Sequence, residues 1–392
     1  MRRRTAPIAL ALATVTALLP GSAVAAGSAG GVRVEATRVI ADAGFTVSLH
    51  QPNERGEVPV NAAAGIENRA YVVRGDRARR LDTSGGGAVR DIDDRGIAVG
   101  VQNLETTDGT LRAGPVFWRG AVRHPIAQPE GRSLAATSIN ERGEIVLASL
   151  AALDSGAPLL RSPGGRLTPI EVPGGATAFV PTSLTNDARA LTDDGRVLAL
   201  TAETFPAVGF HGYVWRDGAV VADVGPGTLA THITDSGYVA GTLYAGDGTS
   251  PFLWRDGVLR RLAGPDGGFA SMTDVNEAGD VAGITDRADG ARRGVLWRAG
   301  GAPRELPTLG GTNSVATTVD DRGVVAGRAE DAQGRSHPVF WVGGRVVDLG
   351  LPAGATEGVA LQITPDGAVY GTVTRPSGTG TTTDVYRWCL NR

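Results

Sequence analysis

The chain has 392 residues, of which 38 are basic and 41 acidic, and a single cysteine. A net charge of −3 excludes the basic balance with which nucleic-acid-binding proteins hold phosphates, and one cysteine excludes an intramolecular disulfide. The 57 glycines and 22 prolines fall at regular turn positions, which argues against a low-complexity disordered chain.

Residues 1–25 have the organisation of a secretory signal peptide. Residues 2–4 are arginines, residues 6–19 are apolar, and Ala-Val-Ala at 23–25 offers a small-residue cleavage site. The apolar stretch is shorter than the ~20 residues that span a bilayer. We therefore expect a secreted, extracellular protein without a membrane anchor after cleavage, and the sequence leaves the export route open.

One unit recurs along the rest of the chain, and residues 273–310 show it most clearly. Asn276–Gly279 form a turn, Val275 and Val281 flank it, and Trp297 ends the third strand. The turn glycine recurs every 40 to 52 residues, near the period of four-stranded propeller blades. The eight turn glycines are Gly56, Gly96, Gly143, Gly195, Gly237, Gly279, Gly323 and Gly367.

The residues around each turn glycine predict the same hairpin eight times. Three positions earlier stands Asn, Asp or Thr, whose short side chain bonds the turn backbone. The glycine accepts the left-handed conformation of a type I turn with a G1 bulge. Residues four before and two after the glycine should form cross-strand pairs that stabilise the sheet. The predicted pairs are Pro52/Val58, Ile92/Ala98, Ile139/Ile145, Leu191/Val197, Ile233/Val239, Val275/Val281, Val319/Val325 and Ile363/Val369.

All six tryptophans end the third strand of a unit. Because the position is internally repeated and follows apolar residues, we expect them to pack between blades rather than to form a ligand-stacking ladder. They are Trp118, Trp215, Trp254, Trp297, Trp341 and Trp388.

The two ends of the repeat predict how the molecule closes. The last unit stops after its third strand, at Trp388, whereas Arg38-Val39-Ile40 matches the fourth strand at Arg304-Glu305-Leu306. An N-terminal strand that completes the last blade would remove exposed sheet edges. We therefore predict that residues 26–392 form one closed all-β propeller of eight four-stranded blades, with seven blades as the alternative, and that the protein is a monomer.

The repeat resembles the HAF repeat of bacterial extracellular proteins. Residues 318–350 are the closest copy, with T-V-D-D-R-G-V-V-A-G, H-P-V-F-W and V-V-D-L-G in order, and residues 273–311 end in T-L-G-G. The resemblance extends over roughly residues 38–389 and implies a secreted, propeller-like protein, with no catalytic residues to carry over. Two units depart from it, at Leu147 and Ala199, where the repeat has glycine.

The sequence predicts no catalytic, cofactor-binding or metal-binding residue. No two of the five histidines lie at metal-ligand spacing, and no G-x-S-x-G, P-loop or dinucleotide motif occurs. Cys389 is expected to be a buried strand residue, with a reactive thiol or an intermolecular disulfide as alternatives.

Seven carboxylates are predicted to surround one face, because each stands two positions before a turn glycine. A calcium site or a face for cationic ligands is the functional interpretation. Arginines follow four of them and weaken the net field, which favours a merely solvated face. The seven are Glu54, Asp94, Glu141, Asp193, Asp235, Glu277 and Asp321.

The opposite face is predicted to carry the binding site. Three insertions, at residues 101–115, 171–190 and 201–213, are expected there, and functional insertions in repeat proteins often gather on one face. The ligand-binding candidates are Phe179, Phe205, Phe210 and His211. Drift in the less regular units is the alternative interpretation.

Together these patterns predict a non-enzymatic extracellular binding or scaffold module. Its partner would be a glycan, a protein or a small molecule, and neither a nucleic acid nor a membrane. The alternative is a glycan-active hydrolase or lyase with its site at the central channel.

Overall fold

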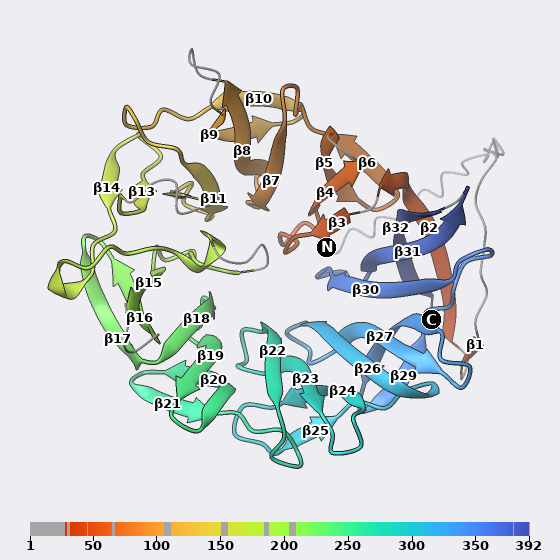
Figure 1. Cartoon of the computed structure of the whole chain (residues 1–392). Helices are drawn as coiled ribbons and strands as arrows, with labels where there is room; N and C mark the ends of the chain where they lie inside the picture. Colours follow the sequence, from red (N-terminus) through yellow and green to blue (C-terminus); the bar gives the residue numbers. More distant parts are fainter. Residues whose placement is uncertain are drawn as a thin grey trace, which may run out of the picture.

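The chain forms a β-propeller of eight antiparallel blades around a central channel (Figure 1). The computed structural model describes residues 28–29, 32–44, 46–64, 67–105, 111–149, 156–183, 188–203, 209–378 and 380–391. The predicted signal peptide and Phe205 lie outside these residues. None of the described residues belongs to a helix long and apolar enough to cross a membrane.

Blades 1 to 4 take up the first half of the chain. Their strands are β3 (Thr46–Leu49), β4 (Val58–Ala64), β5 (Glu67–Arg74) and β6 (Arg77–Arg80); β7 (Gly87–Ile92), β8 (Ile97–Glu105), β9 (Leu111–Arg119) and β10 (Val122–Pro125); β11 (Ala135–Ile139), β12 (Ile145–Ala148), β13 (Leu159–Arg161) and β14 (Leu167–Pro169); and β15 (Val197–Glu203), β16 (Gly209–Arg216) and β17 (Ala219–Pro226).

Blades 5 to 8 follow the repeat more closely. Their strands are β18 (Thr228–Ile233), β19 (Val239–Ala245), β20 (Gly248–Arg255) and β21 (Val258–Arg261); β22 (Ala270–Val275), β23 (Val281–Asp286), β24 (Arg292–Trp297) and β25 (Pro303–Glu305); β26 (Gly310–Val319), β27 (Val325–Asp331), β28 (Ser336–Val342) and β29 (Arg345–Asp348); and β30 (Glu357–Ile363), β31 (Val369–Ser377) and β32 (Gly380–Asn391), joined by β2 (Val32–Gly44) and β1 (Ser28–Ala29).

The hairpin turns have the predicted geometry. All eight turn glycines have positive φ, from 70° at Gly56 to 92° at Gly237, the conformation that glycine adopts without a Cβ penalty. Seven of the eight predicted cross-strand pairs are register partners, including Val275 with Val281. Pairing of β3 with β4 instead begins at Leu49 and Val60. The turn chemistry therefore predicted both the turns and the strand register.

The N-terminal strand closes the propeller as expected. β2 pairs antiparallel with β32, with Glu35 opposite Cys389 and Ile40 opposite Val385. Val34 and Ile40 are buried in this blade, so the contact is hydrophobic as well as hydrogen-bonded. The prediction of eight blades closed by the N-terminal strand is confirmed, and the seven-bladed alternative is wrong.

The tryptophans pack between blades, as predicted. Each is at least nine-tenths buried. Trp118 Nε1 donates to the Asp82 carbonyl at 2.8 Å, and Trp297 Nε1 donates to the Ala263 carbonyl at 2.7 Å. The acceptors lie in the linkers that enter the blades of these two tryptophans, so the indoles of Trp118 and Trp297 fix their blades to the linkers before them.

Cys389 is half-buried in β32, beside the apolar side chains of blades 8 and 1. Burial raises the pKa of its thiol. The reactive form of cysteine is the thiolate, so this environment makes Cys389 a poor nucleophile.

Candidate functional site

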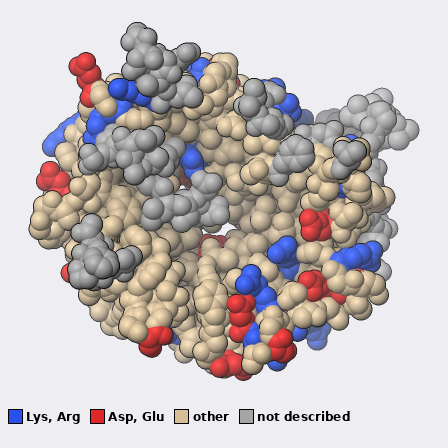
Figure 2. Space-filling view, viewed as in Figure 1, with Lys and Arg blue, Asp and Glu red and all other residues tan. Residues whose placement is uncertain are grey.

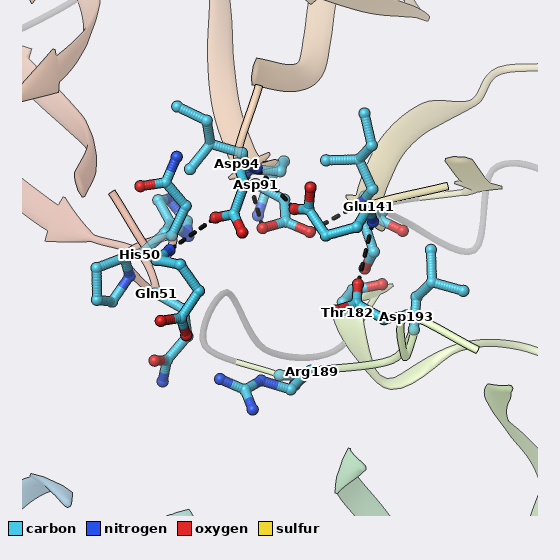
Figure 3. A pocket seen from close by; sticks show the side chains of 18 of the residues that line it. His50, Gln51, Asp91, Asp94, Glu141, Thr182, Arg189 and Asp193 are labelled. Atoms are coloured by element: carbon cyan, nitrogen blue, oxygen red, sulfur yellow. Dashed lines mark hydrogen bonds between the residues drawn. The ribbon is translucent and has the colours of Figure 1, made fainter. Parts of the chain in front are cut away.

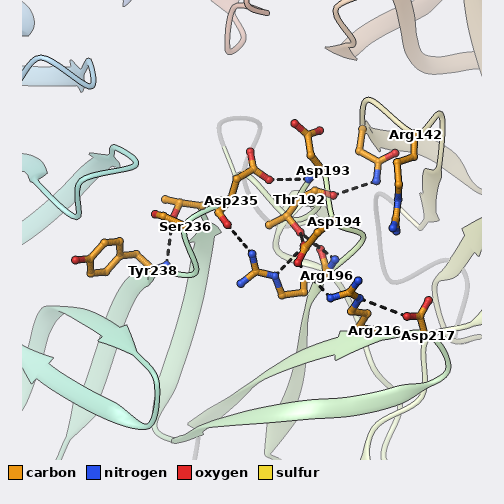
Figure 4. Close-up of polar contacts among 12 residues, drawn as sticks. Arg142, Thr192, Asp193, Asp194, Arg196, Arg216, Asp217, Asp235, Ser236 and Tyr238 are labelled. Atoms are coloured by element: carbon orange, nitrogen blue, oxygen red, sulfur yellow. Dashed lines mark hydrogen bonds and ion pairs between the residues drawn. The ribbon is translucent and has the colours of Figure 1, made fainter.

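The seven predicted carboxylates link one blade to the next around one face; we call them the acidic ring. The Glu54 N–H donates to Asp94 Oδ1 at 2.7 Å, and the Asp94 N–H donates to Glu141 Oε1 at 2.6 Å. The same bond recurs from Glu141 to Asp193, from Asp193 to Asp235 (Figure 4), from Asp235 to Glu277 and from Glu277 to Asp321. Each carboxylate of the acidic ring except Glu54 thus caps the turn of the preceding blade.

The acidic ring is interrupted at blade 8, where Pro365 occupies the position of the carboxylate. Proline has no N–H, so the turn of blade 8 cannot donate at this position to the carboxylate of blade 1, Glu54. Within the part of the chain that the structure describes, the Glu54 carboxylate accepts no hydrogen bond. Glu54 is therefore the member of the acidic ring whose charge has no structural use.

The arginines that follow the ring carboxylates pair elsewhere. Arg95 pairs with Asp93 at 2.6 Å, Arg142 with Glu144 at 2.7 Å and Arg322 with Asp320 at 2.6 Å. Arg196 of blade 4 likewise donates to the Asp235 carbonyl at 2.6 Å (Figure 4). Since these guanidinium groups are already paired, they neutralise the acidic ring less than the sequence suggested.

Blade 4 places part of an insertion at the acidic ring, which corrects a prediction. The chain bridges β15 twice, through Phe179 with Leu200 and through Leu191 with Val197. The bridging positions are twelve apart on one side and three on the other, so the described residues between them, 180–183 and 188–190, bulge away from the innermost strand position. Residues from 171–190 therefore reach the central channel instead of remaining on the opposite face.

This bulge lines a central cavity together with the acidic ring. One part, of ≈ 140 Å³, is lined by Thr182, Arg189, Asp91 and Glu141 (Figure 3) and by Glu54, among others. A second part of ≈ 320 Å³ shares Glu54 and Arg189 with the first, and a third of ≈ 350 Å³ shares Gln51 with both. The molecule is visibly hollowed along its axis (Figure 2). We use "central cavity" for these three parts.

Burial and mutual repulsion act on the carboxylates of the central cavity. Burial raises the pKa of Glu54, and the charges of Asp94 and Asp321 raise it further. Burial likewise raises the pKa of Glu141 and of Asp235, partly offset by the backbone N–H groups that these carboxylates accept. Negative charge is thus concentrated beyond what the fold compensates.

Asp91, the residue before Ile92 at the end of β7, has the largest shift in the cavity. Burial raises its pKa to about 7, against the opposing effect of hydrogen bonds from the Ile139 and Ile92 N–H groups. These bonds are 2.8 Å long and use both carboxylate oxygens. Asp274 in blade 6 bonds Val275 and Val319 in the same way. The repetition indicates that such aspartates join neighbouring blades.

Arg189 is the cation that the bulge brings into the cavity. Its Nη1 lies 3.3 Å from Glu277 Oε1, two blades further on, and its charge lowers the pKa of Glu54, Asp91 and Asp235. Its backbone is held by bonds to Thr231 and Ile233 in blade 5. Arg189 therefore offsets part of the negative charge from a fixed position.

Thr182 supplies a polar atom without a partner at the cavity wall. The residue is 7% exposed and lines the ≈ 140 Å³ part (Figure 3), and its Oγ1 has no hydrogen-bond partner among the described residues. Deeper in the channel, Gln362 is 6% exposed and its Oε1 also has no partner. A buried hydroxyl or carbonyl without a partner costs about 1–3 kcal/mol, so these atoms favour a bound group.

Two of the predicted ligand-binding residues meet in an aromatic cluster. Phe179 and Phe210 lie edge to face with centroids 6.2 Å apart, and Phe210 lies 5.6 Å from Tyr244. Phe179 also packs against the core shared by blades 4 and 5, because its backbone bridge to Leu200 holds it there. This contact with the core could not be foreseen from the loop composition.

His211, the third candidate that the structure describes, stands next to this cluster. It stacks on Tyr213 at 4.4 Å, and its Nε2 lies 2.6 Å from the Asp223 carboxylate. Its ring is therefore held by a stacking contact on one side and a polar contact at its edge. Phe205 belongs to residues 204–208, outside the described part.

A polar depression of ≈ 680 Å³ lies between blades 6, 7 and 8. It is lined by Arg292, Arg328, Glu330 and Glu357, among others, and Arg292 pairs with Asp286 at 2.9 Å. In the view of Figure 2, basic and acidic side chains intermingle over β22–β31. Charges of both signs leave little net field here, unlike the central cavity.

No group of three or more His, Cys, Asp or Glu side chains with the arrangement of a metal site occurs among the described residues. His337 is buried between two carboxylates, with Nε2 3.1 Å from Asp331 and Nδ1 3.0 Å from Asp348. Arg335 also pairs with Asp331 at 2.8 Å. These contacts make a local network that joins strands of blade 7.

The fold and the cavity define a class: a closed, eight-bladed β-propeller with a polar central site. No protein-family model matches the chain, and no curated protein sequence matches it. Among solved structures, the β-propeller domain of the Trilobed protease from Pyrococcus furiosus is similar, with a TM-score of 0.51, 11% identity, and coverage of 79% of this chain and 97% of that one. The similarity shows the propeller fold.

Two further solved structures are more distantly similar. A puromycin-hydrolyzing peptidase of Mycobacterium tuberculosis gives a TM-score of 0.46 at 14% identity, over 86% of this chain and 58% of that chain. The BP39L lectin from Burkholderia pseudomallei gives 0.38 at 15% identity, over 79% of this chain and 97% of the lectin.

Proposed function

We propose that the protein is a secreted, non-enzymatic binding module whose ligand lies in the central cavity. The observation that carries this proposal is the convergence, in one concave space, of carboxylates from successive blades with the buried hydroxyl of Thr182, which has no partner in the described part of the chain. A few convergent polar groups in a formed cavity are typical of ligand sites. The predicted signal peptide and the resemblance to the HAF repeat support the extracellular part.

A binding screen of the mature protein against glycans, peptides and small molecules tests this proposal. A ligand that binds the native protein raises its melting temperature by mass action, so thermal shift identifies hits and titration calorimetry measures them. A hit whose binding is lost on Thr182→Val supports the central cavity. A hit that binds equally to the variant places the site elsewhere.

The aromatic cluster gives the competing location. If the central cavity is the site, Phe210→Ala and His211→Ala should leave the affinity of a hit within about twofold of wild type. Phe210→Ala should still lower the unfolding free energy by about 1 kcal/mol, because aromatic pairs contribute about 0.5–1.5 kcal/mol. Titration and chemical unfolding of both variants check this. Loss of binding in either variant, without loss of structure, would move the site to the cluster.

A glycan-active enzyme is the second candidate, and Asp91 is what favours it. A carboxyl with a pKa of about 7 suits a general acid at neutral pH. However, both Asp91 oxygens accept backbone N–H bonds, one from Ile92 in its own strand and one from Ile139 in blade 3. A carboxylate committed in this way is poorly placed to transfer a proton, so the geometry supports binding better than catalysis.

The raised pKa values predict how stability depends on pH. A carboxyl with a higher pKa in the folded state stabilises the fold at low pH, and this contribution is lost as pH rises through the folded pKa. For Asp91 that pKa is about 7, and Glu54, Glu141 and Asp235 shift in the same direction. We therefore expect the melting temperature to rise as pH falls from about 8 to about 5.

Carboxyl groups with lowered pKa values determine how far the melting temperature can rise as the pH falls. Burial raises the pKa of Asp331, but hydrogen bonds from Arg335 and Gln333 outweigh it and bring the value to about 2. Such groups stabilise the fold above their unfolded pKa and lose this effect below about pH 4. Differential scanning calorimetry across pH should show a maximum near pH 5. A melting temperature that falls steadily from pH 8 to pH 5 would contradict the account.

A further inference from the structure

We propose that the central cavity binds an organic cation, a guanidinium or ammonium group of the ligand, through free carboxylate oxygens of the acidic ring and Thr182 Oγ1. The proposal rests on the binding function proposed above and names the chemical class of the ligand. The source of the cation, a free amine or guanidine or a basic side chain of a peptide, is distinguished by the experiment.

The carboxylates have acceptor capacity left after the fold has used them. Asp94, Glu141, Asp193 and Asp235 each accept one backbone N–H on one oxygen, and their second oxygens accept no bond among the described residues. Glu54 keeps both oxygens. A carboxylate can accept several hydrogen bonds. N–H donors of a ligand can therefore bond the carboxylate oxygens that the turns do not use.

Thr182 is independent of the acidic residues and points to a ligand by itself. Its hydroxyl is buried at the cavity wall without a partner from any residue that the structure describes, and it comes from the bulge of blade 4, not from a turn. Removing an unpartnered hydroxyl should leave the empty protein as stable or stabilise it. If the Thr182 hydroxyl had a structural role, its removal would instead lower the stability of the ligand-free protein.

Arg189 shows that a guanidinium fits this environment. Its side chain is 34% exposed, reaches Glu277 at 3.3 Å and lines two parts of the cavity. Glu277 is fully used, since Asp235 and Ser236 also donate their N–H groups to it. Arg189 therefore leaves Glu54, Asp94, Glu141 and Asp193 available while it raises the electrostatic cost of a second cation.

The part of the central cavity beside Thr182 has room for a cationic head group, and the adjoining parts have room for the rest of a ligand. The ≈ 140 Å³ part beside Thr182 corresponds to about five water molecules, at about 30 Å³ each. A guanidinium carries five N–H donors in one plane and an ammonium carries three, which matches acceptors contributed by several blades. The rest of the ligand can extend into the adjoining ≈ 320 Å³.

Titration calorimetry at low ionic strength tests the proposal with four probes. Agmatine represents a free guanidine, spermidine a free amine, N-acetylated and C-amidated Gly-Arg-Gly a basic peptide, and the equally blocked Gly-citrulline-Gly its neutral isostere. We expect the arginine peptide or the free cations to bind at least about tenfold more tightly than the citrulline peptide, because charge-assisted bonds are about twice as strong as neutral ones. Added salt should weaken this binding. Binding of agmatine alone identifies a free cation, and binding of the arginine peptide alone identifies a basic peptide.

Three variants and a control separate this proposal from a structural role. Glu54→Gln should weaken the bound cation without destabilising the fold, since Glu54 caps no turn. Thr182→Val should weaken binding without lowering the melting temperature, and Arg189→Gln should strengthen it by removing a competing cation. Glu357→Gln, outside the central cavity, should change nothing.

Equal affinity for the arginine and citrulline peptides would overturn the proposal, as would unchanged binding in Glu54→Gln or weakened binding in Arg189→Gln. If a neutral ligand from the screen binds and its binding depends on Thr182, the proposal of a cationic ligand is wrong but the proposed binding function is supported. Binding of calcium without binding of any organic cation would also overturn it. Absence of every ligand from the central cavity would remove both proposals.

Discussion

Deletion of residues 32–44 is expected to lower the unfolding free energy by about 5 kcal/mol and to make the protein aggregate. These residues form β2, which pairs with β32 and buries Val34 and Ile40. Full burial of two such side chains contributes about 3–6 kcal/mol, before the lost hydrogen bonds of the ladder. That is a large share of the 5–15 kcal/mol by which domains are usually stable.

The deletion also leaves β32 as an exposed edge with unpaired backbone groups, which pair readily with another chain. Sedimentation and thermal unfolding of the variant check both effects. Alanine substitution of Arg33 and Thr37, which keeps the strand and its backbone pairing, is the control. A truncated protein that stays monomeric with the wild-type melting temperature would show that β2 does not close the propeller.

Gly279→Val is expected to destabilise the protein by roughly 2–4 kcal/mol. Gly279 has φ of 78°, where an L-residue costs about 1–2 kcal/mol and a β-branched one more. A Cβ at this position would also lie 2.5 Å from the Tyr238 ring. The Arg255 guanidinium lies over the same ring, 4.6 Å from its centroid. Strain and steric overlap therefore add.

Gly290→Val provides the matched control for this prediction. Gly290 has φ of 82°, but nothing lies within 4 Å of a Cβ built there. Equilibrium unfolding in urea should show that Gly290→Val costs only the backbone strain, and Gly279→Val at least about 1 kcal/mol more. Equal losses in the two variants would mean that the contact with Tyr238 adjusts without cost.

The fold could be predicted because each blade repeats the same short sequence pattern at its first hairpin turn. Asn276, Gly279 and the pair Val275/Val281 specify the turn, its handedness and the register together, and the structure keeps all three. Agreement between local and global preferences of this kind is what makes a sequence fold uniquely. The match between Arg38-Val39-Ile40 and a fourth strand predicted the closure for the same reason.

The candidate site could be predicted only in part. The acidic ring follows from the repeat, because its members hold one position in each turn, but their bonds to the next blade depend on the distance between blades. Thr182 and Arg189 belong to a stretch with no counterpart in other blades, so no repeat position predicts where they point. The insertion length signalled a departure at blade 4, and the bulge toward the axis became visible only from the bridges of Phe179 and Leu191.

Hydrogen–deuterium exchange of the mature protein, with and without a ligand found in the screen, tests the location of the site most directly. We expect added protection at residues 53–57, 93–97 and 140–144, the turns that line the central cavity, and at 181–183 and 188–191. Residues 209–213 and 242–245, at the aromatic cluster, should exchange at unchanged rates. Protection confined to the aromatic cluster would contradict the central cavity as the binding site.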